Sequence, residues 1–277
     1  MSTATTTDPR WSPAVRVTFP HVVVSEWRKL TSLRSTWWTL GTALACHAGI
    51  GLLMAIYTRV NGHASSPEEA TSWAIGATQL TQLAIVVLAV MIITSEYTTG
   101  QIRASVAAVP TRLPILVAKA VVLTGAVVVV SVLGVALSMG AGVIIGGDTV
   151  AFTLPDSETA RILAATPLYL VGIALLTFGV AALIRNTGGT IAIMMAMLLV
   201  LQNILVVIPF HLTRLIAPWL PGNAGQLILV DSESLDGWKE AVRPGAFLGA
   251  WGGYGVLLAW AALFLVLAGV RLRTRDV

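Results

Sequence analysis

The stretch from Thr94 to Lys119 reads TSEYTTGQIRASVAAVPTRLPILVAK, and it separates two long apolar runs. Between Gly100 and Pro110, apolar residues recur at spacings of four and three, at Ile102, Val106 and Val109. This spacing predicts a short amphipathic helix that lies along a membrane surface and ends at Pro110. A loop that only joins two spanning helices needs few polar residues. We therefore expect this stretch to present a structured surface outside the lipid.

Composition places the chain in the membrane. Of its 277 residues, 56% are hydrophobic and only 11% are charged, whereas soluble domains carry about 25% charged residues. Several apolar runs exceed the roughly 20 residues needed to cross the hydrocarbon core. The predicted fold class is an all-α polytopic membrane protein.

Six spanning helices are expected, preceded by an interfacial helix that begins at Val22. In that first helix, Val23, Trp27, Leu30 and Leu33 share one stripe, and Ser25, Arg28, Lys29 and Ser32 lie on the other side. Residues 1–21 are predicted to be a disordered N-terminal segment, and residues 22–277 a single transmembrane domain. The expected spans are Trp37–Tyr57, Trp73–Thr94, Leu116–Ile145, Ile162–Ile184, Thr190–Pro209 and Phe247–Val270.

Charge sets the predicted orientation. The side that carries both termini and the 94–119 stretch holds twelve of the 17 basic residues and four of the 13 acids. The positive-inside rule therefore predicts cytoplasmic termini.

The same rule also accounts for the net charge of +4, so no nucleic-acid partner is expected. The predicted location is a cell membrane, and the preference for arginine over lysine fits a GC-rich bacterial genome.

Several kinds of chemistry have no motif in this sequence. It lacks the GxxxxGK[ST] phosphate-binding loop, HExxH, paired-cysteine metal motifs and GxSxG. A single cysteine, Cys46, excludes an internal disulfide. We predict no catalytic residues, no metal site and no cofactor held by this chain. No Asp or Glu falls in the expected spans, which disfavours a proton-coupled carrier.

Four polar residues do fall inside the expected spans, at a similar depth in the outer half of the membrane: Gln79, Gln82, Gln202 and Asn203. One interpretation is that they line a substrate route. The other is ordinary hydrogen bonding between helices, worth about 0.6–2 kcal/mol per bond.

Two further features are left open by the sequence. His47 lies mid-span, where a histidine is either functional or a buried packing residue. Small residues repeat every four positions at Gly134, Ser138, Gly142 and Gly146, and again at Gly249 and Gly253. Such stripes permit close helix contact, either within one chain or between two copies.

The chain resembles membrane permeases of the type-2 ABC exporter family from Val22 to its end. The resemblance rests on SEWRKL (Ser25–Leu30), ITSEYTTGQIR (Ile93–Arg103), RNTGG (Arg185–Gly189) and WLPGNAG (Trp219–Gly225), of which the second is the most specific.

The resemblance implies that the segment with Glu96, Gly100 and Arg103 forms a cytoplasmic coupling helix, which docks on a separate ATPase subunit that binds ATP and Mg²⁺. Glu96 and Arg103 are then expected to contact the partner or nearby backbone, not each other. It also implies a second permease copy, a substrate route at the interface of the two copies, and an external re-entrant region within Phe210–Ala246. The predicted function is ATP-driven export.

Two other functions remain compatible with the sequence: a membrane anchor or regulatory component without transport activity, and an ion-coupled carrier. The sequence leaves the substrate open, since a lipid, a peptide antibiotic, another drug or a polysaccharide is compatible with so apolar a route. It also leaves open whether the two permease copies are identical.

Overall fold

The fold is a bundle of long helices. The computed structural model describes residues 18–62, 67–100, 113–146, 157–201, 204, 216–230, 232, 235 and 248–274, and no strand occurs among them. The helices are α1 (Phe19–Ser32), α2 (Arg34–Asn61), α3 (Pro67–Thr98), α5 (Leu113–Gly146), α6 (Ser157–Ile184), α7 (Thr187–Met195), α10 (Pro221–Gln226) and α12 (Ala250–Thr274).

Five of these helices are long and apolar enough to cross a membrane: α2, α3, α5, α6 and α12. They coincide with five of the six predicted spans and extend beyond most of the predicted ends. At the predicted fifth span, α7 continues as a π-helical segment, Ala196–Leu201, and together they form a shorter apolar helix. Residues 202 and 203 lie outside the described part, so the sixth crossing stays a prediction.

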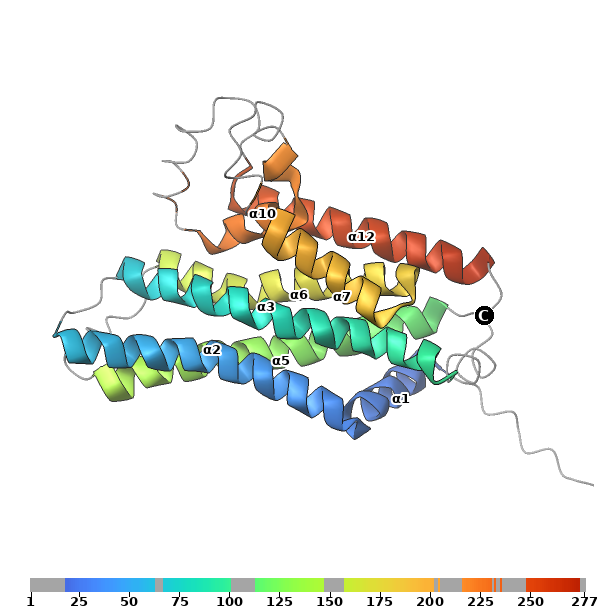
Figure 1. The fold of residues 1–277 in the computed structure, drawn as a ribbon, viewed down its shortest axis with the longest axis horizontal. Coiled ribbons are helices and arrows are strands. Elements are labelled where there is room, and N and C mark those ends of the chain that lie inside the picture. The colour runs from blue at the N-terminus through green and yellow to red at the C-terminus, as the bar shows by residue number, and fades with distance from the viewer. Residues whose placement is uncertain are drawn as a thin grey trace, which may run out of the picture.

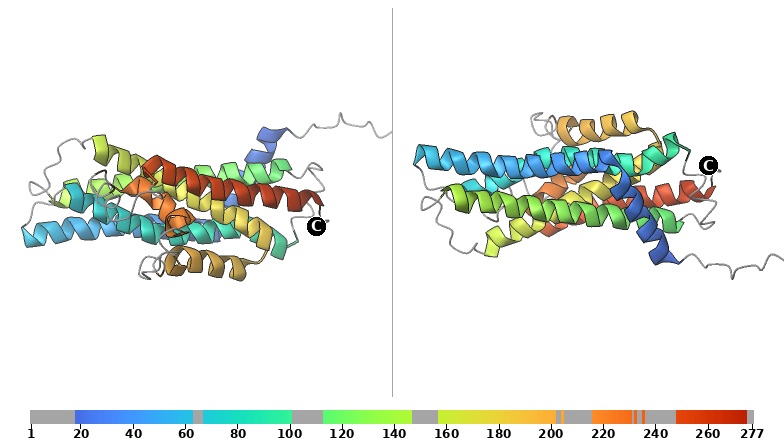
Figure 2. Two further views of the ribbon diagram at one scale, coloured as in Figure 1. Left: turned by 90° about the horizontal axis from the view of Figure 1, so that it is seen from above. Right: turned by 90° about the horizontal axis from the view of Figure 1, so that it is seen from below.

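Helix α6 occupies the centre of the bundle. It packs against α3, α5 and α12, and α2 packs against α3 and α5 on one side (Figures 1 and 2). Several of its large side chains are fully buried, among them Tyr169, Leu170, Ile173 and Phe178. Helix α1 lies at the same end of the bundle as the last residues of α3 and α12. By the charge rule, this α1 end is the predicted cytoplasmic side.

The small-residue stripe of α5 makes contacts within the chain. A Cβ on Gly134 would meet the ring of His47 at 3.0 Å, and the hydroxyl of Ser138 donates a 3.0 Å hydrogen bond to the His47 carbonyl. These residues let α5 approach α2 closely. For this half of the stripe, the structure thus decides between the two alternatives left open by the sequence.

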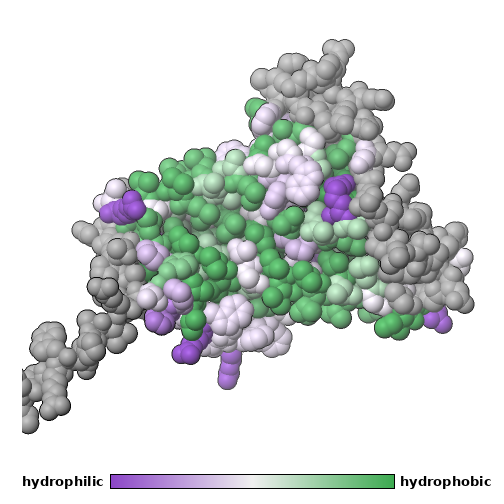
Figure 3. All heavy atoms as spheres, turned by 180° about the vertical axis from the view of Figure 1, so that it is seen from behind, coloured by the Kyte–Doolittle hydropathy of each residue, from purple (hydrophilic) through white to green (hydrophobic). Residues whose placement is uncertain are grey.

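The outer surface of the bundle is apolar. Figure 3 shows one face of the molecule, on which hydrophobic side chains cover most of the described area between the two ends. Trp37 and Trp38, at the start of the first predicted span, are 61% and 79% exposed. An exposed apolar surface of this extent marks contact with a membrane or with another protein, and it fits a multi-pass membrane protein.

At the opposite end, the WLPGNAG sequence folds back into the bundle. Helix α10 begins at Pro221 and packs against α12 and α6. Arg161 of α6 holds the end of this region by donating to the carbonyls of Ile228 at 2.9 Å and Val230 at 2.8 Å. Residues 216–230 therefore pack back onto the helices, and their re-entry into the membrane stays a prediction. The rest of Phe210–Ala246, apart from 232 and 235, lies outside the described residues.

Candidate functional site

Four charged side chains form a closed ring at the α1 end. Lys29 Nζ lies 2.7 Å from Glu26 Oε1 and 3.0 Å from Glu96 Oε1. Lys119 Nζ lies 2.6 Å from Glu26 Oε2 and 2.7 Å from Glu96 Oε1. Each lysine therefore binds both glutamates, and the ring of two acids and two bases is neutral. It joins three helices, because Glu26 and Lys29 belong to α1, Glu96 to α3 and Lys119 to α5.

Helical geometry positions the α1 members of the ring. The buried face of α1 consists of Val22, Glu26 and Leu30, which recur every fourth residue and so lie one above another. The predicted stripe differs from this face, because Trp27 and Leu33 are 44% and 46% exposed. An acid occupies the middle of the buried face because Lys119 approaches it from α5.

The ring is largely shielded from water. Glu26, Glu96 and Lys119 are at most 5% exposed, whereas the side chain of Lys29 is 37% exposed. Burial alone would lower the pKa of Lys29, but its hydrogen bonds to Glu26 and Glu96 prevail and raise that pKa above the usual 10.5. A buried charge is tolerated only when it is paired. The three helices therefore hold one another in a single relative arrangement at this end.

The position of Glu96 differs from its predicted contact with a partner protein or nearby backbone. Its carboxylate faces inward and pairs with two lysines of its own chain. Its second oxygen, Oε2, is buried and has no hydrogen-bond donor among the described residues. The Glu96 carboxylate is thus paired within its own chain, with Lys29 of α1 and Lys119 of α5.

Gly100 ends the α3 region. Helix α3 stops at Thr98, and Gly100 has φ +73°, in the left-handed region that favours glycine after a helix. The predicted coupling helix after it, including Arg103 and Pro110, lies outside the described residues. The coupling role of Glu96, Gly100 and Arg103 stays a prediction.

The end of α3 also contacts the α6–α7 turn. Thr187 Oγ1 donates to Thr94 Oγ1 at 2.8 Å, and the guanidinium of Arg185 lies 4.9 Å from the centre of the Tyr97 ring. The turn is closed by Asn186, whose side chain caps α7 by accepting from the Gly189 N–H at 2.7 Å. In the sequence, RNTGG (Arg185–Gly189) is only one of the segments that carry the resemblance. Its contacts with Thr94 and Tyr97 depend on the packing of α3 against α7.

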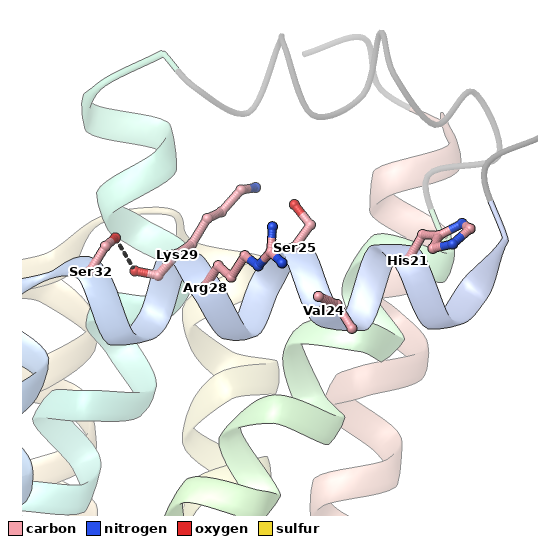
Figure 4. A pocket seen from close by; sticks show the side chains of 6 residues that line it. All are labelled: His21, Val24, Ser25, Arg28, Lys29 and Ser32. Carbon is pink, nitrogen blue, oxygen red and sulfur yellow. Dashed lines mark hydrogen bonds between the residues drawn. The ribbon is translucent and has the colours of Figure 1, made fainter. Parts of the chain in front are cut away.

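A polar face of α1 lies beside the ring. His21, Ser25, Arg28, Lys29 and Ser32 lie along one side of α1, where they border a hollow of about 600 Å³ together with Val24 (Figure 4). The Ser32 hydroxyl donates to the Lys29 carbonyl at 2.8 Å. Lys29 therefore belongs to both features: its ammonium closes the ring and its stem borders the exposed polar face.

Two of the four predicted route residues are described. Gln79 and Gln82 share a face of α3, as predicted, and the Gln82 amide donates to the Gln79 side-chain oxygen. Gln82 is fully buried and accepts from the Tyr169 hydroxyl at 2.7 Å, while Gln226 of α10 lies 3.5 Å from that hydroxyl. Gln82 therefore makes a hydrogen bond between helices, whereas Gln79 is only half-buried.

Gln202 and Asn203 lie outside the described residues. Whether they meet Gln79 at a shared surface, and whether any of the four lines a substrate route, stays a prediction.

His47 is a packing residue within the bundle. It is 1% exposed, and its Nδ1 lies 3.2 Å from Thr81 Oγ1. The single hydroxyl hydrogen of Thr81 is donated to the Ala77 carbonyl at 2.8 Å, so His47 Nδ1 carries the hydrogen of the His47–Thr81 bond. Within the described part of the chain, no three His, Cys, Asp or Glu side chains are grouped as a metal site requires.

A known protein family matches most of the chain. The family described as ABC-2 family transporter protein matches residues 22–203, well over half of the chain. The matched range contains the whole four-residue ring, the α6–α7 turn and both described glutamines. No curated protein sequence matches the chain.

Proposed function

Since the chain belongs to the ABC-2 family of transporter proteins and is a membrane-spanning permease component of an ABC transporter, we propose that it exports its substrate with energy supplied by a separate ATPase subunit. ATP and Mg²⁺ would bind to that subunit, because this sequence contains no phosphate-binding loop. Two permease copies would form the route between them, with α3 and α7 at their interface and the termini in the cytoplasm.

The single observation that supports this proposal is the buried ring. It ties the interfacial helix α1 to the last turn of α3 and the start of α5, the two helices on either side of the 101–112 segment. Force applied by an ATPase at this end would move α1, α3 and α5 together, because separating them would leave charges buried and unpaired. Closure of the ATPase subunits would then tilt α3 at the proposed interface.

The test separates binding from coupling. In the double variant Glu26→Gln/Lys29→Gln, α1 loses both of its ring charges, while the neutral pair Glu96–Lys119 remains. We expect the permease to co-purify with its ATPase and to permit ATP hydrolysis, but transport into vesicles should fall severalfold. Arg34→Gln, at the exposed start of α2, is the matched control and should transport normally.

Three results would contradict the proposal. They are ATP hydrolysis by the purified chain alone, the absence of any ATPase that co-purifies with it, and transport that survives ATP depletion. The last result would favour the ion-coupled carrier, and the second the anchoring component.

A further inference from the structure

A long apolar groove runs between α5 and α12 on the outside of the bundle. Its volume is about 650 Å³, within the range of small-molecule sites. One wall extends along α5 from Leu113 to Thr124, the other along α12 from Leu265 to Arg273, and Leu175 of α6 lies between them.

The groove exists because α5 and α12 both pack against α6 but make few contacts with each other. Small side chains keep it deep, since Ala120 and Gly269 lie on its opposite walls. A Cβ on Gly269 would already meet Leu113 at 3.2 Å. Val121 and Val266, on the rims, are 48% and 63% exposed, so the groove is open to the lipid that surrounds a spanning helix.

The length of the groove matches one lipid leaflet. From Leu113 to Thr124, α5 rises by about 16 Å at 1.5 Å per residue. The hydrocarbon core of a bilayer is about 30 Å thick, so an acyl chain of one leaflet covers about half of it. The groove begins at the α1 end of the bundle, where such a chain would begin at its headgroup.

Arg273 provides a positive charge at the end of the groove where a headgroup would lie. Arg273, in the last turn of α12, is exposed and lines the groove, and none of the described lining residues is acidic. A guanidinium binds phosphate oxygens in a planar, bidentate geometry. Apolar packing against acyl chains does not distinguish one phospholipid headgroup from another. A cation at the end of the groove favours a headgroup with a net negative charge.

We propose that this groove binds one acyl chain of a phospholipid with a net negative headgroup, and that the phosphate of this lipid binds Arg273. A neighbouring protein helix fits the groove less well. Most of its described lining residues are leucine or valine, and among them Thr124 carries the only hydroxyl. The described walls therefore lack the polar or uniformly small surface that helix pairs in membranes use.

The test measures lipid binding to the delipidated full-length chain by native mass spectrometry, with dioleoyl phosphatidylglycerol and dioleoyl phosphatidylcholine as probes. We expect about fivefold tighter binding of the anionic lipid, the preference that one arginine near a headgroup confers. Arg273→Gln should abolish this preference. Val121→Phe, which fills the groove, should weaken binding of both lipids.

Matched controls separate the groove from the general surface. Val129→Phe makes the same substitution on α5 away from the groove, and Arg28→Gln removes a cation on α1; both should bind as the unmodified chain does. The proposal is overturned if Arg273→Gln keeps the preference, if Val121→Phe binds normally, or if Val129→Phe weakens binding equally. It is also overturned if a photo-crosslinker at position 121 captures a second copy instead of lipid. Arg273 is exposed in the last turn of α12, so its replacement should not unfold the chain. Arg273→Gln therefore still tests the headgroup preference if Val121→Phe fails to fold.

Discussion

The ammonium of Lys119 lies 2.7 Å from the carboxylate of Glu96, which joins the two ends of the 101–112 segment by a buried ion pair. The last turn of α3 and the start of α5 are therefore held at a fixed separation whatever conformation the segment between them adopts. Glu96 therefore pairs with side chains of the helices beside the 101–112 segment, and its coupling role stays a prediction.

Removal of Glu96 should destabilise the protein. In Glu96→Ala, Lys119 stays buried with only Glu26 as its partner, and the ring gains a net positive charge. Breaking a buried ion pair in this way costs about 3–5 kcal/mol. The expected result is a clear fall in the thermal unfolding temperature of the detergent-purified chain. The double variant Glu96→Gln/Lys119→Met restores neutrality and should recover most of the loss; equal stability of Glu96→Ala and the unmodified chain would show that the pair does not hold the helices.

The contribution of Lys29 should depend on pH in the alkaline range. Its folded-state pKa lies above the usual 10.5, because hydrogen bonds to Glu26 and Glu96 outweigh the opposing effect of burial. A raised pKa means that the stabilisation is complete below pH 10.5 and is lost as the pH rises through the folded-state value. Unfolding of the unmodified chain and Lys29→Gln should therefore differ by a constant amount up to about pH 10 and converge above it. A difference that vanishes below pH 9 would contradict this.

The two glutamines of α3 should respond differently to leucine. Gln82→Leu removes the acceptor of the buried Tyr169 hydroxyl, and an unsatisfied buried group costs about 1–3 kcal/mol. Gln79→Leu removes the acceptor of the Gln82 amide but keeps the buried Tyr169–Gln82 bond, so it should lower stability by less than Gln82→Leu does. If the route prediction holds, Gln79→Leu, Gln202→Leu and Asn203→Leu should alter transport or substrate preference in reconstituted vesicles without affecting insertion. Normal transport by all three would leave these residues with a structural role only.

Two glycines of α12 offer a matched comparison. A Cβ on Gly253 would clash with the Ala224 carbonyl of α10, whereas nothing lies within 4 Å of a Cβ on Gly255. Gly253→Ala should therefore displace α10 and lower stability by about 1–3 kcal/mol. Gly255→Ala should raise it slightly, because alanine favours the helix. Thermal unfolding of both variants decides this; equal effects would mean that α10 does not pack against α12 in the membrane.

Membrane topology can be checked by single-cysteine labelling after Cys46 is replaced. The charge distribution predicts that cysteines at Ser66 and Ser234 react with an impermeant reagent from outside intact cells. A cysteine at Thr99, which is exposed just after α3, should be protected until the cells are opened. Labelling of Thr99 from outside would invert the orientation.

Apolar run lengths and charge asymmetry alone predicted the membrane class, the all-α fold and the spans that became α2, α3, α5, α6 and α12. These features are local, because a spanning segment must satisfy its own backbone hydrogen bonds and present apolar side chains wherever it packs. The motifs at Glu96 and Arg185 were also found from the sequence, since glycine, proline and charged residues are conspicuous between apolar runs.

The partners of these residues depended on the tertiary structure. Nothing in the spacing of Glu26, Glu96 and Lys119 indicates that they meet, because α1 must first lie across α5 to bring the acid on its buried face to the lysine. In the same way, Gln82 became a structural hydrogen-bond acceptor only because α6 placed Tyr169 beside it. A helical pattern determines which residues share a face, whereas the packing of one helix on another determines which faces, and therefore which charges and hydrogen-bonding groups, are brought together.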